Sequence, residues 1–342
     1  LLCGDGLIAG LFAGEDDNAG NPIAGNGLGS LDRLEELAHL ATEHHLRLLL
    51  DLAVTSVHGS DQLLYSHPDW FAVADASPMT GDHLPDPRRR DGGSDAYRLT
   101  PQPRFNSPEV AEALLECWHM RLAMLIDAGV AGFVCHDPAG LPGDFWCRLV
   151  ERTREQRSCC HFLAWTPGCS HQQLERLADC GFDAVFSSGA WWDFRAPWYF
   201  REHEKLAAIA PVLGFPEDPF GPRAARVHGW HDKDTRRLGA LRALRFAALS
   251  GSGWLMPMGF EFGLTEPLGI AHNAAASTRI RMPQQFAQAC AESDFNLDAE
   301  VRAANQAMSA GGFRLRTVSA PEAPVLLLAR EVGVHQLIAV NP

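Results

Sequence analysis

The strongest constraint on the fold is a repeated order in which a helical segment is followed by a short apolar run. Six such runs occur, at 46–54, 130–135, 160–165, 184–186, 211–215 and 254–259. Short apolar runs without strict alternation predict strands covered on both faces, which is the usual state of parallel strands. No Gly-rich dinucleotide turn follows any of them. The pattern therefore predicts an α/β fold, a (β/α)8 barrel of the TIM type, rather than an open sheet.

Capping residues mark where the helices between these runs begin and end. Ser107, followed by proline and glutamate, predicts a helix start, and Gly129 predicts the end of that helix. Ser170 and Gln173 have the spacing of a capping box, in which each side chain bonds a backbone N–H of the first turn. We therefore expect helices at 31–41, 107–128, 143–157, 170–180, 232–249 and 301–308.

The barrel boundaries follow from where this alternation stops. A complete barrel has eight strands, so two more are expected before residue 30, where only 7–12 is a candidate. The Pro- and Gly-dense stretch 55–106 is long for a plain connection, which predicts a functional loop or small subdomain inserted after the third strand. The chain begins without methionine or a secretion signal, and we expect it to be a piece of a longer protein.

The C-terminal end of the chain changes character after residue 308. Apolar runs at 325–330 and 336–340 flank a turn at Gly333, which predicts two paired strands. We therefore expect a (β/α) barrel over 1–308 and the start of a β-sandwich-like domain over 309–342.

Charge and cysteine usage argue against several classes of function. The chain has 29 basic and 42 acidic residues, a net charge of -13, which disfavours nucleic acid and anionic membrane surfaces as partners. No apolar stretch reaches the roughly 18 residues that span a membrane. Nine cysteines without a repeated spacing predict reduced thiols in a cytoplasmic protein. They lack the spacing of metal ligands, so no metal and no other cofactor is expected.

Five short motifs together span most of the chain. The most specific is His67-Pro68-Asp69-Trp70-Phe71, and the others are Asp16–Pro22, Leu50–Ala53 with His58 and Asp61, Leu174–Phe182 and Gly259–Glu261. They resemble motifs of glycoside hydrolase family 13, the α-amylase clan, in which the first reads H-P-E-W-F. Within that clan the order of features is most similar to the bacterial α-1,4-glucan:maltose-1-phosphate maltosyltransferases.

The resemblance implies a chemistry that needs two carboxylates at the carboxyl ends of neighbouring strands. One attacks the anomeric carbon and forms a covalent glycosyl-enzyme, and the other protonates the leaving oxygen. The clan places the nucleophile at the end of G-F-R-x-D and the acid at the end of F-L-A-E. The corresponding stretches here are 132–136 and 162–165, so the nucleophile position is His136 and the acid position is Trp165.

Three other carboxylates are candidates for catalysis. Asp218 loosely matches the third carboxylate of the clan, and Glu217 precedes it. Asp137 follows the nucleophile position by one residue. Because neighbouring side chains of a strand face opposite ways, Asp137 is expected to point away from the pocket unless a bulge re-aims it.

The same resemblance implies residues that bind substrate. Trp165 either stacks on a sugar ring or fills the space that the smaller acid would leave. Asp51 is also expected to hydrogen-bond the loops around its strand end. The expected substrate-binding set is Asp51, His58, Trp165, Glu217, Trp191 and Trp192.

Three functions are compatible with these motifs. The first is a catalytically impaired domain that binds α-glucan or maltooligosaccharide, or that regulates an active relative as its partner. The second is an active α-glucan glycosyltransferase or hydrolase that uses Asp218 with Asp137 or Glu217. The third is a structural barrel that serves as an interface, for example in a homo-oligomer.

Overall fold

The computed structural model describes residues 31–55, 63, 66–73, 101–142, 144–219, 221–266, 283–293, 295–307, 313–320, 322–332 and 334–341. The chain divides into two compact units, which we treat separately. The first unit takes residues 1–81, 95–166 and 172–184, and the second takes 82–94, 167–171 and 185–342.

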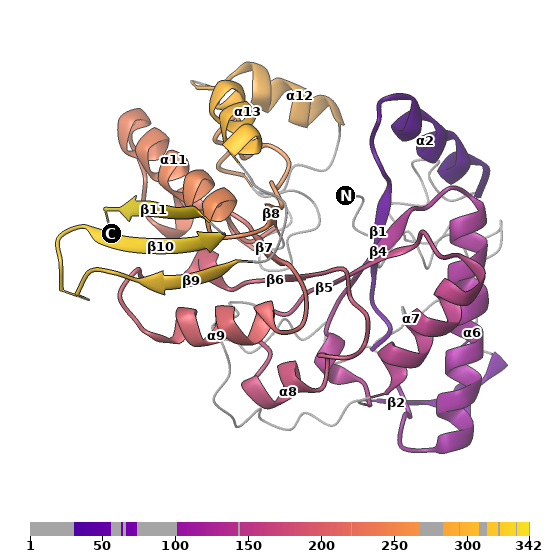
Figure 1. Ribbon diagram of the computed structural model, residues 1–342. Coiled ribbons are helices and arrows are strands. Elements are labelled where there is room, and N and C mark those ends of the chain that lie inside the picture. Colours follow the sequence, from indigo (N-terminus) through magenta and orange to yellow (C-terminus); the bar gives the residue numbers. More distant parts are fainter. Residues whose placement is uncertain are drawn as a thin grey trace. The chain divides into compact units, whose positions relative to one another are not determined.

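Parallel strands form the centre of the first unit. Their order is β1 (Leu49–Leu52), β4 (Gly132–Cys135) and β5 (His161–Ala164). Asp51 pairs with Val134 and Cys135 pairs with Ala164, so the three strands are in register at their carboxyl ends. Strands β1 and β4 lie side by side as a parallel pair, in the same unit as the long helices α6 and α7 (Figure 1).

Helices α6 (Pro108–Asp127) and α7 (Phe145–Gln156) pack against each other in this unit. The helix α6 begins where its cap predicts, because the Ser107 hydroxyl accepts the Val110 N–H at 3.4 Å. The remaining elements of the unit are α2 (Leu31–Glu43), η2 (Pro68–Trp70), the paired β2 (Phe71–Val73) and β3 (Pro101–Pro103), η3 (Pro138–Gly140) and the short α8 (His171–Glu175).

The two faces of this sheet have different roles. Phe133 and Phe162 are fully buried, and the Arg154 guanidinium of α7 lies 5.6 Å from the Phe162 ring, so this face meets the helices. Side chains alternate along a strand, so Asp51, Val134 and their in-register neighbours occupy the opposite face. Gly132, two residues before Val134, lies on the same face as Val134, and a Cβ there would stand 2.4 Å from the His161 carbonyl oxygen, so the position leaves no room for a side chain.

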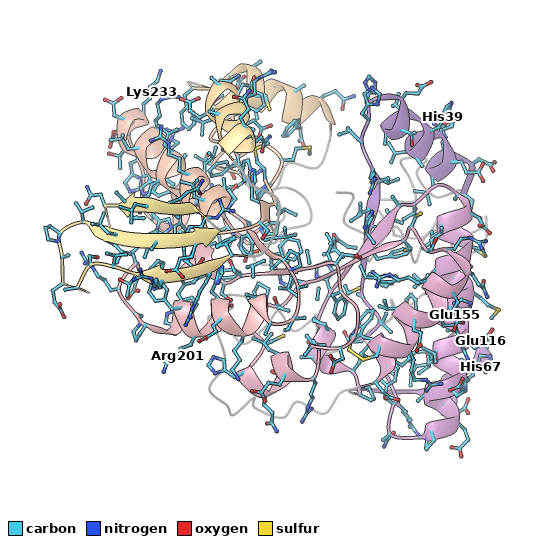
Figure 2. The ribbon with its side chains drawn as sticks, in the orientation of Figure 1. His39, His67, Glu116, Glu155, Arg201 and Lys233 are labelled. Atoms are coloured by element: carbon cyan, nitrogen blue, oxygen red, sulfur yellow. A yellow bond between two sulfur atoms is a disulfide. The ribbon has the colours of Figure 1, made fainter. Side chains whose placement is uncertain are left out.

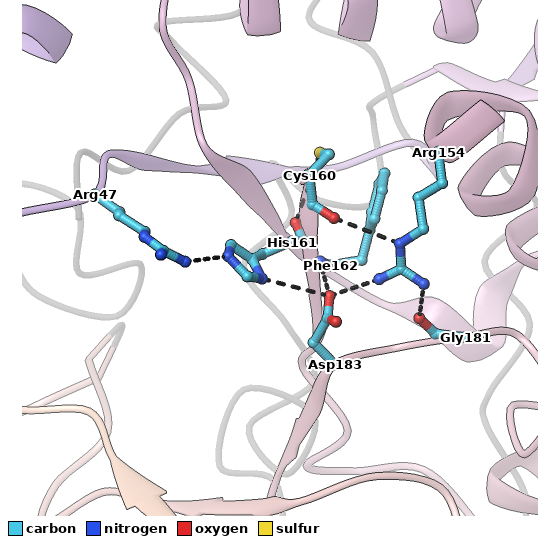
Figure 3. A network of polar contacts seen from close by, with 7 residues as sticks. All are labelled: Arg47, Arg154, Cys160, His161, Phe162, Gly181 and Asp183. Atoms are coloured by element: carbon cyan, nitrogen blue, oxygen red, sulfur yellow. Dashed lines mark hydrogen bonds and ion pairs between the residues drawn. The ribbon is translucent and has the colours of Figure 1, made fainter. Parts of the chain in front are cut away.

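A polar network lies at the amino-terminal end of β5 (Figure 3). The His161 Nε2 atom is 2.5 Å from the Arg47 guanidinium, and its Nδ1 atom is 3.9 Å from Asp183 Oδ2. Arg154 binds the same Asp183 oxygen at 2.6 Å, and the Phe162 N–H donates to it at 2.8 Å. The network joins α7, β5 and the loop before β6 at the end opposite to the strand carboxyl ends.

The second unit contains the parallel strands β6 (Ala184–Phe186), β7 (Val212–Gly214) and β8 (Gly253–Trp254). Helix α11 (Lys233–Leu249) packs against β7 and α13 (Asp298–Ala307). Asp232 caps α11 by accepting the Thr235 N–H at 2.9 Å. The other elements are η4 (Gly189–Trp191), α9 (Trp198–Ala207), α10 (Ala224–Val227) and α12 (Pro283–Ala291).

A three-stranded antiparallel sheet ends the second unit. Its order is β11 (Val334–Val340), β10 (Leu326–Val332) and β9 (Arg314–Thr317), drawn in yellow in Figure 1. Leu315, Leu328 and Ile338 pack on Tyr199 of α9 and Phe246 of α11 in one apolar cluster. The Arg330 guanidinium is buried 4.2 Å from the Phe313 ring.

The structure differs from the sequence-based expectation in several elements. The helix expected over 170–180 ends at Glu175 and continues as turns, and the strand expected over 254–259 is the two-residue β8. The sequence pattern did not predict the helices α9, α10 and α12 or the strands β2, β3 and β9. The two strands expected before residue 30 lie outside the described residues.

The cysteines also differ from expectation. Cys147 of α7 and Cys180, after α8, form a disulfide, although we expected reduced thiols. The two residues are 33 positions apart, and the packing of α7 against the turn after α8 brings them together. The other cysteines among the described residues form no disulfide. Sequence spacing alone does not indicate this pairing.

Candidate functional site

The strand ends of the first unit bring three of the predicted residues onto one face. Asp51 is in register with Val134, and His136 lies two residues further along, so both point to the same side. His136 continues the ladder through its N–H to the Leu52 carbonyl at 2.8 Å, and Trp165 continues it to Cys135 at 2.9 Å. The face therefore presents Asp51, His136 and Trp165 at the carboxyl ends of β1, β4 and β5.

At these strand ends, Asp51 is paired with the residue at the nucleophile position. His136 Nε2 lies 3.0 Å from Asp51 Oδ1, and both side chains are largely buried. The Trp165 ring is 6.2 Å from the His136 ring and only 2% of the residue is exposed. Burial raises the pKa of the neighbouring Cys135 thiol well above its ordinary value, with Cys160 and the Asp51 carboxylate contributing. These strand ends hold an imidazole, an indole and one carboxylate.

Asp137 leaves the strand ladder by a change of backbone conformation. Its φ is +45° and its ψ is +51°, in the left-handed region that a residue other than glycine rarely adopts. This conformation begins η3 and turns the side chain back toward Gly140, where an added Cβ would lie 2.3 Å from Asp137 Oδ2. The Asp137 carboxylate thus lies against the η3 turn.

In the second unit, Glu217 follows β7 and forms a buried ion pair. Its carboxylate accepts Arg223 NH1 at 2.6 Å and the Ala224 N–H at 2.8 Å. Arg223 also donates to the carbonyls of Met258 at 2.7 Å and Glu266 at 3.2 Å. The pair ties the loop after β7 to the segment after β8, so both oxygens of Glu217 already have donors.

Asp218, the third candidate, lies beside Glu217 and is also buried. An added Cβ at Gly221 would lie 2.6 Å from Asp218 Oδ2, so the glycine makes room for this carboxylate. Glu261 follows β8 in the sequence, and its carboxylate accepts the Gly259 N–H at 3.0 Å.

The two tryptophans after β6 have different surroundings. Trp192 is buried in the apolar core, where its ring stacks 4.5 Å from Tyr199 and its Nε1 donates to the Ala196 carbonyl at 2.8 Å. Trp191 is half-buried, and its ring lies edge-on to Phe215 at 5.4 Å. Of this pair, Trp191 has the more accessible ring.

Other predicted features are addressed only in part. His58 and the greater part of 55–106 lie outside the described residues. Within the described residues, no group of three or more His, Cys, Asp or Glu side chains could hold a metal ion. The helices of the same residues are all too short or too polar to cross a membrane.

Sequence reasoning missed Arg223, the residue that fixes Glu217. Two buried carboxylates next to each other in the chain require a counter-charge, and Arg223 lies six residues from Glu217. That requirement was the available signal, although it does not select Arg223 from other arginines nearby.

Comparison with known proteins places these strand ends in context. No family profile matches the chain. The α-1,4-glucan:maltose-1-phosphate maltosyltransferase of Burkholderia pseudomallei is 34% identical over 331 residues, which cover 92% of this chain and 28% of that protein. The chain thus spans less than a third of its relative's length.

Solved structures of α-glucan enzymes share the fold at low sequence identity. A maltogenic α-amylase from Thermotoga neapolitana has a TM-score of 0.59 at 14% identity, over 92% of this chain and 69% of that one. A cyclic α-maltosyl-(1→6)-maltose hydrolase from Arthrobacter globiformis, solved with maltose, has a TM-score of 0.59 at 16% identity, over 91% and 71%. The predicted fold, a partial (β/α)8 barrel with the start of a C-terminal β-domain, is therefore confirmed.

Proposed function

We propose that this chain, which resembles the α-amylase clan in both sequence and fold, binds α-glucans or maltooligosaccharides and is catalytically impaired. One observation carries the proposal. The strand ends that should supply a nucleophile and an acid hold His136, paired with Asp51 at 3.0 Å, and Trp165, which is buried. Neither residue supplies the carboxyl chemistry that a retaining mechanism uses.

The two replacements affect different parts of the reaction. A carboxylate nucleophile also stabilises the positive charge that develops on the sugar, and an imidazole bound to Asp51 does so less well. Loss of the acid leaves the departing oxygen unprotonated, and general acid catalysis typically contributes about 10²–10⁴-fold. We expect both deficits to act together.

The relatives support the choice of ligand. The related Burkholderia protein is named for an α-glucan and maltose 1-phosphate, and the Arthrobacter neighbour was solved with maltose. Within the second unit we expect Trp191 and Asp218 to contact the glucan, whereas the buried ring of Trp192 supports a packing role. The proposal places the protein in the cytoplasm with glycogen-type glucans, although the disulfide between Cys147 and Cys180 is unusual in a reducing compartment.

Calorimetry with maltohexaose, together with phosphate release from maltose 1-phosphate, tests both halves of the proposal. We expect measurable binding and no phosphate release above the rate of a heat-denatured sample. Turnover that disappears in Asp218→Asn would overturn the claim of impairment. Absence of any sugar affinity, together with a stable oligomer, would instead favour a purely structural barrel.

An active enzyme that uses Asp218 with Asp137 or Glu217 is the alternative. The positions of these carboxylates directly after strand ends favour it. It would require Glu217 to leave Arg223, or Asp137 to leave the η3 turn. The Glu217→Gln and Asp137→Asn variants show which of the two carboxylates acts with Asp218, because only substitution of the carboxylate in use would abolish turnover.

A further inference from the structure

The buried arginine Arg223 joins two loops at the strand ends of the second unit. Each of its three guanidinium nitrogens donates to a different acceptor: Nη1 to the Glu217 carboxylate at 2.6 Å, Nη2 to the Met258 carbonyl at 2.7 Å and Nε to the Glu266 carbonyl at 3.2 Å. The first acceptor follows β7 and the other two follow β8, the next strand of the sheet. One side chain thus sets the spacing of two loops at the carboxyl ends of neighbouring strands.

The segment between β7 and α10 is closed into a loop by the same contacts. The two oxygens of Glu217 accept Arg223 Nη1 and the Ala224 N–H, so the two ends of the loop are held together. Asp218 lies inside this loop, directly after the held glutamate. Gly221 makes room for its carboxylate, because an added Cβ would stand 2.6 Å from Asp218 Oδ2. The position of the Asp218 carboxylate therefore depends on how the loop is closed.

The loop after β8 fits closely around the same guanidinium. Gly259 has a φ of +88°, in the left-handed region that favours glycine. An added Cβ there would stand 3.2 Å from Arg223 Nη2 and 2.6 Å from the Leu264 side chain. The missing side chain lets the loop approach Arg223, so the guanidinium has little freedom to move.

Stability alone does not account for a charge pair at this place. The Arg223 and Glu217 side chains are only 4% and 3% exposed. Taking two charges out of water is unfavourable, and apolar side chains of similar volume often stabilise a fold as well as a buried ion pair does. Apolar side chains lack the fixed donor directions of a planar guanidinium. The pair is therefore suited to holding loops in one arrangement, at the end of the sheet where barrel folds place their sites.

We propose that Arg223 is a positioning residue for glucan binding: through Glu217 it holds the Asp218 carboxylate where it accepts hydrogen bonds from sugar hydroxyls. The inference rests on the proposed function, because it takes Asp218 as a contact of the glucan. Arg223 is buried and its nitrogens bond to the protein, so it acts through the loop rather than on the sugar. A carboxylate that is held in place before binding loses little conformational freedom when the sugar arrives.

The double substitution Glu217→Leu with Arg223→Met tests this role, because it removes the positioning contacts without leaving a buried charge. Calorimetry with maltohexaose should show an affinity about tenfold lower than in the wild type, as expected for one charge-assisted hydrogen bond. Asp218→Asn alone should weaken binding by a similar factor. Adding Asp218→Asn to the double variant should cause no further loss, since residues that act through one contact are not additive.

Helix α11, whose first residue Lys233 is labelled in Figure 2, provides the matched control. Arg237 of this helix forms an ion pair with Glu300 of α13 in the same unit. Arg237→Met with Glu300→Leu removes an arginine–glutamate pair as the test variant does, but away from the loops after β7 and β8. The affinity for maltohexaose should stay at the wild-type value.

A second measurement does not depend on sugar. Arg223→Lys keeps the positive charge and Glu217 but offers one nitrogen in place of three. The Ala224 amide, which donates to Glu217, should then exchange with deuterium faster than in the wild type.

The outcomes distinguish this inference from the proposed function. Unchanged exchange at Ala224, or wild-type affinity in the double variant, would overturn the role of Arg223 and leave glucan binding in place. A further loss on adding Asp218→Asn would also overturn it, because the pair would then act independently of Asp218. A wild type without affinity for maltohexaose would overturn the proposed function, and this inference with it.

Discussion

At the scale of single residues, two buried side chains next to each other on α9 have pKa values that are shifted in opposite directions. Glu202 is fully buried, and its carboxylate accepts the Ser188 N–H at 3.0 Å; burial raises its pKa to about 7, although the bond to Ser188 lowers it. His203 bonds the Ser250 carbonyl at 3.2 Å. Burial lowers its pKa to about 4, and Arg330 adds to that direction.

These pKa values predict a nearly flat stability profile between pH 4.5 and 6.5. The folded state keeps the Glu202 proton that the unfolded chain loses above pH 4.5, so this group lowers stability as pH rises to about 7. His203 stays unprotonated in the folded state down to about pH 4, whereas in the unfolded chain it binds a proton below pH 6.5. This group therefore raises stability as pH rises from about 4 to 6.5. The two contributions cancel where they overlap.

Removing one of the two groups should reveal the slope of the other. In Glu202→Gln, the free energy of unfolding should rise with pH by about 1.4 kcal/mol per unit between pH 4.5 and 6.5. In His203→Gln, which keeps an N–H donor for Ser250, it should fall by a similar amount. Urea denaturation across that range measures both slopes. Parallel profiles for the two variants would contradict the assignment.

The buried pair of Glu217 and Arg223 predicts a second result at this scale. Glu217→Ala leaves a buried guanidinium without its carboxylate, and we expect a loss of about 3–5 kcal/mol in the free energy of unfolding. The double substitution Glu217→Leu with Arg223→Met should lose clearly less, because no charge is left buried. Chemical denaturation of the wild type and the two variants measures these losses. A double variant as unstable as the single one would show that packing, not charge, is the cause.

At the scale of elements, the disulfide joins α7 to the turn after α8. It closes a loop of 33 residues, and such cross-links typically contribute about 2–4 kcal/mol. Cys147→Ser should therefore lower the melting temperature under non-reducing conditions, and a reducing agent should have the same effect on the wild type. Cys159→Ser is the control, because Cys159 is exposed and free. A wild type insensitive to reductant would contradict this prediction.

The closeness of β4 and β5 predicts the result of a glycine substitution. An alanine at Gly132 would place its Cβ against the His161 carbonyl of the next strand, and a backbone atom cannot move without shifting the strand pair. We expect Gly132→Ala to cost about 1–3 kcal/mol. Gly253→Ala, where the contact is the tip of the Leu213 side chain, should cost less. Thermal unfolding of both variants provides the measurement, and equal losses would argue against a role for strand spacing.

At the scale of the whole molecule, local patterns predicted the elements but not the contacts across them. Ser107 and Gly129 mark the two ends of a helix by interactions within its own first and last turns, so the sequence contains the signal for α6. The length of α8 depends on tertiary packing, which a capping box at Ser170 does not encode.

The site shows the same division between local and distant information. The register that puts Asp51 beside His136 comes from pairing of strands about 80 positions apart, and no local pattern reports it. The left-handed conformation of Asp137 and the partner of Glu217 likewise arise from packing. The sequence identified which residues end the strands, whereas their partners required the structure.

The hydrogen bonds in the network at the amino-terminal end of β5 have a defined donor-to-acceptor direction. An arginine guanidinium only donates hydrogen bonds, so His161 must accept at Nε2 and carry its proton on Nδ1, facing Asp183 (Figure 3). Arg154, the Phe162 N–H and His161 then all converge on the Asp183 carboxylate. Arg154 also donates to the carbonyls of Gly181 and Cys160. The Asp183 carboxylate is the acceptor that the contacts from α7 and β5 share, so its loss would remove both sets of contacts at once.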